Sequence, residues 1–329
     1  FTTESEIPED MSKEHITSHA MHLWDMRIID YMKSGQCQRI IDEMPEFTEQ
    51  AIAETDGGAF TWLLSTLEVP KYPAILHGYG TIIGTGNAIV EWPVYRHKGG
   101  VSMSGGEIIE SFIVPVHPHT VLAPEQNQGW QNLRKAYDDA AQIIKDREAD
   151  LLIIYSTTWP SIIGHQIISD PNPEWVMVDH DFHDLGSIHY SFNIDAEFAK
   201  QWNKENHARG LQSRCVNYHG FPIDVGSVVA LTLLNPDNKI PAVIVSSNVY
   251  ADRSETTVLA KACKDLVYKT GRKAVAITAM SLSNRMFTEH IDAKDDRIHS
   301  LKDDEWNRKI LEFLGQGRLE DVSLSLIHI

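Results

Sequence analysis

Long apolar runs, basic residues and cysteines are all scarce in this 329-residue chain. No stretch reaches about 18 apolar residues, which argues against a membrane-spanning helix. Lys and Arg number 29 against 46 Asp and Glu, so the formal net charge is −17 and nucleic-acid binding is not expected. The three cysteines, Cys37, Cys215 and Cys263, form no CxxC pair, which disfavours a thiolate zinc site and predicts a reducing, cytoplasmic setting.

The end of the chain and one internal segment have unusual sequences. The last six residues, 324–329, match the translation of a transposase-end adapter used in sequencing libraries; a natural apolar tail is the alternative. Residues 98–102 contain Lys-Gly-Gly just before Met103, which fits either a linker or a ribosome-binding site ahead of a start codon. We therefore expect a chain cut at both ends, in which 1–97 and 103–323 come from two adjacent genes or from a natural fusion.

The two parts of the chain share an internal sequence repeat. The segment 24–35 matches 306–317, and Trp24, Ile28 and Gly35 have identical partners there. Self-similarity of this kind indicates two copies of one domain type. The first copy contains only its last third, and the second contains nearly everything except its last third.

Hydrophobic periodicity predicts alternating strands and helices. The expected strands are 88–92, 107–114, 151–156, 242–247 and 273–278, and the expected helices are 20–33, 38–44, 46–55, 59–67, 127–147, 195–207, 224–234, 254–270 and 304–315. This order predicts an α/β fold with a largely parallel central sheet flanked by helices. Ligands of such sheets lie beyond the carboxyl ends of the strands, which are expected here at 115–119, 156–159, 246–248 and 278–281.

Several of these strand ends carry a family resemblance. The motifs are PVHPH at 115–119, YSTTW at 155–159, VNYHGFPID at 216–224 and DEWNR at 304–308, with IPEDMSKE at 7–14, GGAFTW at 57–62 and GTGNA at 84–88 in the first copy. With them the chain resembles class III extradiol ring-cleavage dioxygenases of the 2-aminophenol 1,6-dioxygenase type. The resemblance covers nearly the whole chain: 1–97 is similar to the end of the catalytic β subunit, and 103–323 to a truncated non-catalytic α subunit.

The resemblance implies iron chemistry in the catalytic subunit. Such enzymes hold Fe(II) by two histidines and one carboxylate, and the open face of the metal takes the aromatic substrate and O₂. The carboxylate position falls on Glu54, and the two histidine ligands fall before the first residue of this chain. Glu54 also lies on the same helical face as Phe47 and Ala51, where a carboxylate needs a partner; a partly exposed helix end before Gly57 is the alternative.

The second copy lacks the residues that this chemistry needs. The histidine-ligand positions fall on Val116 and Thr158, and the proton-transferring histidine falls on Asn284. Val has no donor atom, and Asn transfers no proton near neutral pH. The histidines at 117 and 119 have plausible metal spacing, but no second-strand histidine accompanies them. The group His180, Asp181, His183, Asp184 and His189 reads either as a metal cluster or, as we expect, as a solvated loop.

We therefore expect part of an Fe(II)-dependent extradiol dioxygenase that opens 2-aminophenol or a catechol-like ring, working as an α/β heteromer. The chain alone is expected to be inactive and to bind no iron. A non-catalytic scaffold or interaction protein on the same fold is the alternative. We also expect 36–92 to pack onto 103–320 in place of the missing third, with Phe60, Trp62, Leu63 and Ile89 against the strands of the second copy.

Overall fold

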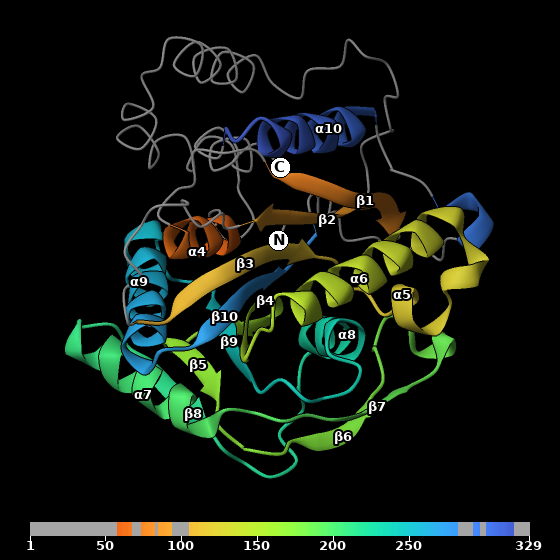
Figure 1. Cartoon of the computed structure of the whole chain (residues 1–329). Coiled ribbons are helices and arrows are strands. Elements are labelled where there is room, and N and C mark those ends of the chain that lie inside the picture. Colours follow the sequence, from red (N-terminus) through yellow and green to blue (C-terminus); the bar gives the residue numbers. More distant parts are fainter. Residues whose placement is uncertain are drawn as a thin grey trace.

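The computed structural model describes residues 58–67, 74–82, 85–93, 105–281, 292–296 and 301–318 (Figure 1). The elements, in chain order, are α4 (Gly58–Thr66), β1 (Ile75–Ile82), β2 (Thr85–Pro93), β3 (Glu107–Val114), α5 (His119–Leu122), η2 (Pro124–Gln126), α6 (Gln128–Asp146), β4 (Leu151–Ser161), β5 (His165–Ile168), β6 (Glu174–Met177), η3 (His183–Leu185), β7 (Ile188–Ser191), α7 (Ala196–Ala208), β8 (Ser213–Val216), α8 (Val225–Leu234), β9 (Ala242–Asn248), α9 (Arg253–Thr270), β10 (Lys273–Ala279), η4 (Ala293–Asp295) and α10 (Leu301–Gly315). The helices expected at 20–33, 38–44 and 46–55 and the linker at 98–102 lie outside the described residues.

The expected largely parallel central sheet is confirmed. Eight strands follow the order β1-β2-β3-β10-β4-β9-β5-β8, and the central strands β3, β10, β4 and β9 run parallel. Their sequences are almost continuous apolar runs, because helices cover both faces of the sheet. A separate antiparallel pair, β6 and β7, lies at the lower rim of Figure 1.

Helices form a layer on each face of the sheet. Residues of α4, α7 and α9 share one core cluster with one face of the strands, and residues of α6 and α8 share another with the opposite face. The helix α8 is apolar on nearly all sides, and eight of its ten residues are buried. None of the helices in the described ranges is long and apolar enough to cross a membrane.

The hairpin β1–β2 extends the sheet beyond β3. Strand β2 pairs antiparallel with β3, so residues 85–93 extend the sheet formed within residues 105–281. Only a short strand at 88–92 was expected here, and β2 is longer. Strand β1 was not expected, because glycines and polar residues interrupt the alternation of apolar residues in its sequence. Gly78 lets β1 approach α6, since a Cβ at this position would lie 2.7 Å from Ala136 Cβ.

The packing expected for residues 36–92 onto 103–320 is confirmed for the residues of both segments that the structure describes. Trp62 and Leu63 of α4 are fully buried, and the Trp62 ring stacks on Tyr155 of β4 with centroids 5.5 Å apart. Ile89 of β2 is fully buried with the core residues of the α6 side. The side chain of Phe60 and residues 36–57 lie outside the described part.

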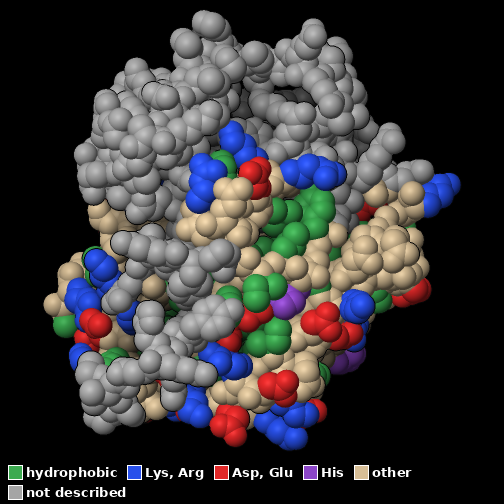
Figure 2. All heavy atoms as spheres, turned by 45° about the horizontal axis from the view of Figure 1, so that its top comes forward, with side chains coloured by type: hydrophobic (Ala, Val, Ile, Leu, Met, Phe, Trp, Pro, Cys, Tyr) green, Lys and Arg blue, Asp and Glu red, His purple; other side chains and the backbone are tan. Residues whose placement is uncertain are grey.

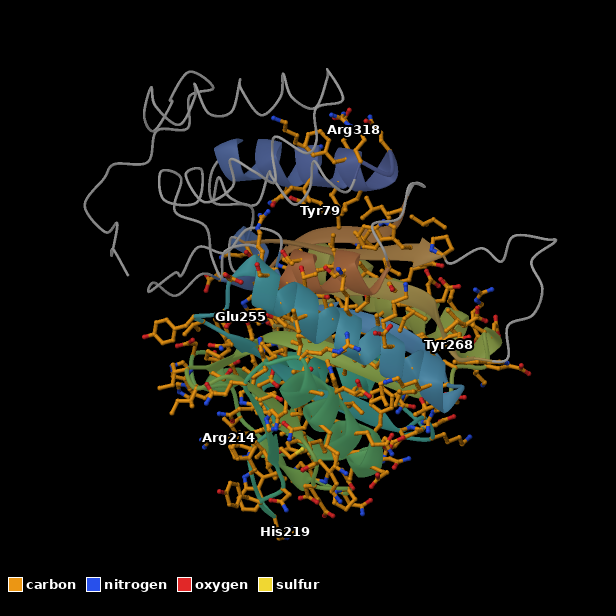
Figure 3. The ribbon with its side chains drawn as sticks, turned by 90° about the vertical axis from the view of Figure 1, so that its left-hand side faces the viewer. Tyr79, Arg214, His219, Glu255, Tyr268 and Arg318 are labelled. Atoms are coloured by element: carbon orange, nitrogen blue, oxygen red, sulfur yellow. The ribbon has the colours of Figure 1, made fainter. Side chains whose placement is uncertain are left out.

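Helix α10 covers the outer part of this extended sheet. Its residues Ile310, Phe313 and Leu314 are buried in the core cluster that contains α4. The Ala74 N–H donates to Leu314 O (2.7 Å), and Asn307 Nδ2 donates to Tyr79 Oη (3.3 Å). Figure 3 shows Tyr79 directly below α10. The face turned forward in Figure 2 carries side chains of both charge signs around apolar ones.

Several short strands were not expected from the sequence. β5, β6, β7 and β8 have four residues each, too few for a periodic signal to stand out from the surrounding polar chain. β4 also continues past the predicted end at 156, because Ser161 still pairs with Asn248 of β9 after an irregularity in register.

Replacement of Trp62 by Ala should show that α4 belongs to the core. We expect the free energy of unfolding to fall by about 3–5 kcal/mol, because a fully buried indole is lost and a cavity remains. Urea unfolding followed by far-UV circular dichroism measures this. The matched control is Trp175→Ala, at a Trp that is 55% exposed, for which less than about 1 kcal/mol is expected. Equal effects of the two substitutions would contradict the assignment.

Candidate functional site

The predicted strand ends meet at one edge of the sheet. Because β3, β10, β4 and β9 are neighbours and parallel, their carboxyl ends lie side by side. The Met280 N–H donates to Val114 O (2.9 Å), which ties the end of β10 to the end of β3. Thr157 Oγ1 donates to Ala279 O (3.1 Å), which ties β4 to β10. The edge expected from the sequence is therefore confirmed as a single hydrogen-bonded structure.

A carboxylate, Asp224, organises this edge. Its Oδ1 accepts hydrogen bonds from Ser156 Oγ (2.5 Å), Thr158 Oγ1 (2.6 Å) and the Ser227 N–H (3.0 Å). Asp224 is also the N-cap of α8, where a negative charge interacts favourably with the positive end of the helix dipole. The network therefore fastens the start of α8 onto the end of β4.

The backbone of α8 fills the space between the ends of β3 and β4. The Gly226 N–H donates to Thr158 Oγ1 (2.9 Å). A Cβ on residue 226 would lie 2.6 Å from Thr158 Oγ1, 2.9 Å from Val116 Cγ1 and 3.1 Å from Ser156 Oγ. Glycine is therefore required here, and Val116, just after β3, and Thr158 of β4 converge on the same point.

These residues do not fit an Fe(II) site built from two histidines and a carboxylate. Val116 is 5% exposed and offers no donor atom. Thr158 Oγ1 already donates to Asp224 and accepts from Gly226. Hydroxyl groups and one carboxylate remain, whereas the expected site needs imidazole ligands. Glu54 and Asn284, the expected carboxylate ligand and the position of the proton-transferring group, lie outside the described residues.

The two histidines after β3 lie in an aromatic cluster. The ring of His119 lies 4.6 Å from Trp130 and 4.7 Å from Phe182 between centroids, and His117 lies 6.2 Å from His119. Burial, with a smaller contribution from His117, lowers the pKa of His119 to about 3. Burial also lowers the pKa of His117, although the carboxylates of nearby Asp179, Asp296 and Asp181 raise it. Both rings are therefore neutral near pH 7.

The second histidine-rich group is a surface feature, as expected. His180, Asp181, His183, Asp184 and His189 are all exposed. Asp179, His180 and Asp181 place their donor atoms within 4.8 Å of one another, but the His180 side chain is 91% exposed and pairs with Asp181 at 3.2 Å. Asp179 Oδ1 instead accepts from the Asp181 and Phe182 N–H groups, which shapes the turn.

The sequence did not reveal the role of two residues at this edge, Asp224 and Gly226. For Asp224 the sequence did contain a signal, since an Asp directly before an apolar helix is a typical N-cap. The helix expected at 224–234 therefore contained the signal for the cap. Nothing in the sequence indicated that this cap would meet Ser156 and Thr158, which lie more than sixty residues earlier.

Replacement of Gly226 by Ala should destabilise the protein although Ala favours helices. The new methyl group would overlap Thr158 and Val116, and we expect a loss of about 1–3 kcal/mol in the free energy of unfolding. The matched control is Gly315→Ala in α10, where a Cβ would meet nothing within 4 Å. Chemical unfolding of both variants measures the difference, and equal stabilities would contradict the close approach.

Protonation of His119 should weaken the fold at acid pH. Because its pKa is about 3 when folded and about 6.5 when unfolded, the unfolded chain gains the proton first as the pH falls below 6.5. This group should therefore lower the free energy of unfolding by roughly 2 kcal/mol between pH 7.5 and pH 5. In His119→Phe the difference between the two pH values should shrink accordingly, whereas in His189→Gln, at an exposed position, it should not. An unchanged difference in His119→Phe would refute the assignment.

Comparisons with known proteins agree on one family. The model of the catalytic LigB subunit of aromatic ring-opening dioxygenase matches residues 113–326. The beta subunit of 2-aminophenol 1,6-dioxygenase from Pseudomonas sp is 31% identical over 238 residues, which cover 67% of this chain and 78% of that protein. The alpha subunit of 2-aminophenol 1,6-dioxygenase, also from Pseudomonas sp, is 27% identical over 214 residues, which cover 65% of this chain and 79% of that protein.

Among solved structures, the alignment with the uncharacterized protein JW3007 from Escherichia coli K12 covers 60% of this chain and 81% of the chain of that protein. Its TM-score is 0.36 and its identity 9%, so it adds nothing to the assignment. The family match starts within β3 and extends over the whole edge formed by β3, β10, β4 and β9. The chain belongs to the LigB family of aromatic ring-opening dioxygenase subunits.

Proposed function

We propose that residues 103–323 form a non-catalytic, α-subunit-like domain of an extradiol-type dioxygenase, and that this chain alone opens no aromatic ring. The observation that carries the proposal is the filled edge of the sheet. Val116, Thr158 and Gly226 are in contact where the family resemblance would put two metal-binding histidines. Neither the space nor the donor atoms for that metal are present among these residues.

The cofactor and the substrate belong to the same proposal. Fe(II) would be held by a separate catalytic subunit, with a carboxylate in the position of Glu54 as one ligand. The substrate would be 2-aminophenol or a catechol-like aromatic, with O₂ as the second reactant. Support comes from the two Pseudomonas relatives, which are the alpha and beta subunits of one dioxygenase. An α/β heteromer is therefore the arrangement that we propose, in the cytoplasm.

The origin of the chain from two copies of one domain type is also part of the proposal. Residues 1–97 would derive from the C-terminal part of a catalytic-type subunit and 103–323 from the α-like copy, with 98–102 between them. The packing of residues 58–67, 74–82 and 85–93 supports this. Helix α4 and the hairpin β1–β2 complete the sheet and core of residues 105–281, as a C-terminal part of the same domain type would.

An oxygen-consumption assay tests the proposed function. The purified chain, supplied with Fe(II) and 2-aminophenol under reducing conditions, should consume O₂ no faster than the same mixture without protein. The positive control is the assembled 2-aminophenol 1,6-dioxygenase from Pseudomonas sp, with its alpha and beta subunits. Uptake that increases in proportion to the concentration of this chain, with loss of 2-aminophenol, would overturn the proposal.

A further inference from the structure

A small separate core holds the β6–β7 loop (residues 178–187) against the body of the domain. This buried cluster, distinct from those on the two faces of the sheet, consists of Ile82, Ala123, Trp130 and Leu133. Phe182 and Leu185 of the loop pack against it as partly buried side chains. A cluster of so few residues can open while the main core stays closed.

The backbone hydrogen bonds of this loop are local. The Asp181 and Phe182 N–H groups donate to Asp179 Oδ1, and the Leu185 N–H donates to Phe182 O. Within the part of the chain that the structure describes, no backbone hydrogen bond joins residues 179–186 to another element. The loop is therefore held in place by the packing of Phe182 and Leu185.

His119 lies where the loop meets α6. Its ring lies 4.6 Å from Trp130 and 4.7 Å from Phe182 between centroids, and the residue is 2% exposed. The Nδ1 atoms of His119 and of His117 are both buried without a hydrogen-bond partner. A positive charge on either ring would lack water, and two charged rings with centroids 6.2 Å apart would repel each other. The closed loop therefore favours two neutral rings.

Carboxylates from two segments oppose this effect only in part. Burial lowers the pKa of His117, although Asp179 and Asp181 of the loop and Asp296 beside η4 raise it. Burial, and then His117, lower the pKa of His119. α6 contributes the uncharged ring of Trp130, whose Nε1 donates to Asp296 Oδ2 (2.9 Å). The other charged or titratable groups of these segments are exposed and screened by water: His180, His183, Asp184, Glu125, Asp292 and Lys294.

We propose that the β6–β7 loop is a pH-sensitive element, which protonation of His119 and His117 releases from α6 while the central sheet stays folded. Release transfers both rings to water, where a histidine binds a proton with a pKa of about 6.5. Because the pKa of His119 is about 3 with the loop closed, the closed form loses stability as the pH falls below 6.5. Release also exposes Phe182, Leu185 and the part of Trp130 that they cover.

Limited proteolysis of the full chain by thermolysin tests the proposal. This protease cleaves before Phe and Leu, so cuts before Phe182 and Leu185 report release of the loop. Mass spectrometry measures the initial rates at about pH 7.5 and pH 5.5, and each rate is divided by that of a synthetic peptide of residues 178–187 at the same pH. The ratio should increase at least about tenfold at the lower pH, because protonation of His119 increases the released population by that factor.

Three variants, each first checked for folding by circular dichroism, identify the groups responsible. His119→Phe keeps an aromatic ring that cannot be protonated, so most of the increase should disappear. His189→Gln, at an exposed position on β7, is the matched control and should keep the full increase. Phe182→Ala removes the docked ring, so cleavage before Leu185 should already be fast at pH 7.5. An equal ratio at both pH values, an unchanged increase in His119→Phe, or a parallel rise of cleavage within 151–156 of β4 would each overturn the proposal.

Discussion

The close approach of α8 to the ends of β3 and β4 determines which atoms line this edge of the sheet. Helix and strands can touch because residue 226 has no side chain, and the contact is held by a carboxylate that caps the helix and accepts two hydroxyl hydrogen bonds. The negative charge of Asp224 is stabilised by the helix dipole and by these donors together. These hydrogen bonds through Asp224 Oδ1 hold the start of α8 against the end of β4.

The sheet and its two covering layers depend on elements from both parts of the chain. Trp62 of α4 stacks on Tyr155 in the middle of β4, and β2 pairs directly with β3. Burial of such large side chains contributes most of the stability of a domain of this size. Residues 58–67, 74–82 and 85–93 are thus part of the core of residues 105–281, although up to two hundred residues of sequence separate the contacting groups.

One loop connects the capped edge of the sheet with the β6–β7 hairpin. It leads from β8 to α8, passes Trp175 of β6 at Gly220, and ends at Asp224. The Ile223 N–H donates to Tyr190 Oη of β7 (3.0 Å), so the hairpin and the start of α8 are joined directly. The hairpin is therefore connected through this loop to the carboxylate at the sheet edge.

The sequence by itself determined the α/β class, most long helices and strands, and the edge of the sheet where the site lies. Continuous apolar strands such as 151–156 and amphipathic helices such as 127–147 were readable because burial on two faces and on one face leaves different periodicities. Only the tertiary structure decided that Asp224 meets Ser156, that β1 and the short strands β5–β8 form, and that Trp175 of β6 is exposed. Such contacts depend on residues far apart in the chain, or on segments of four residues, and local patterns carry no information about either.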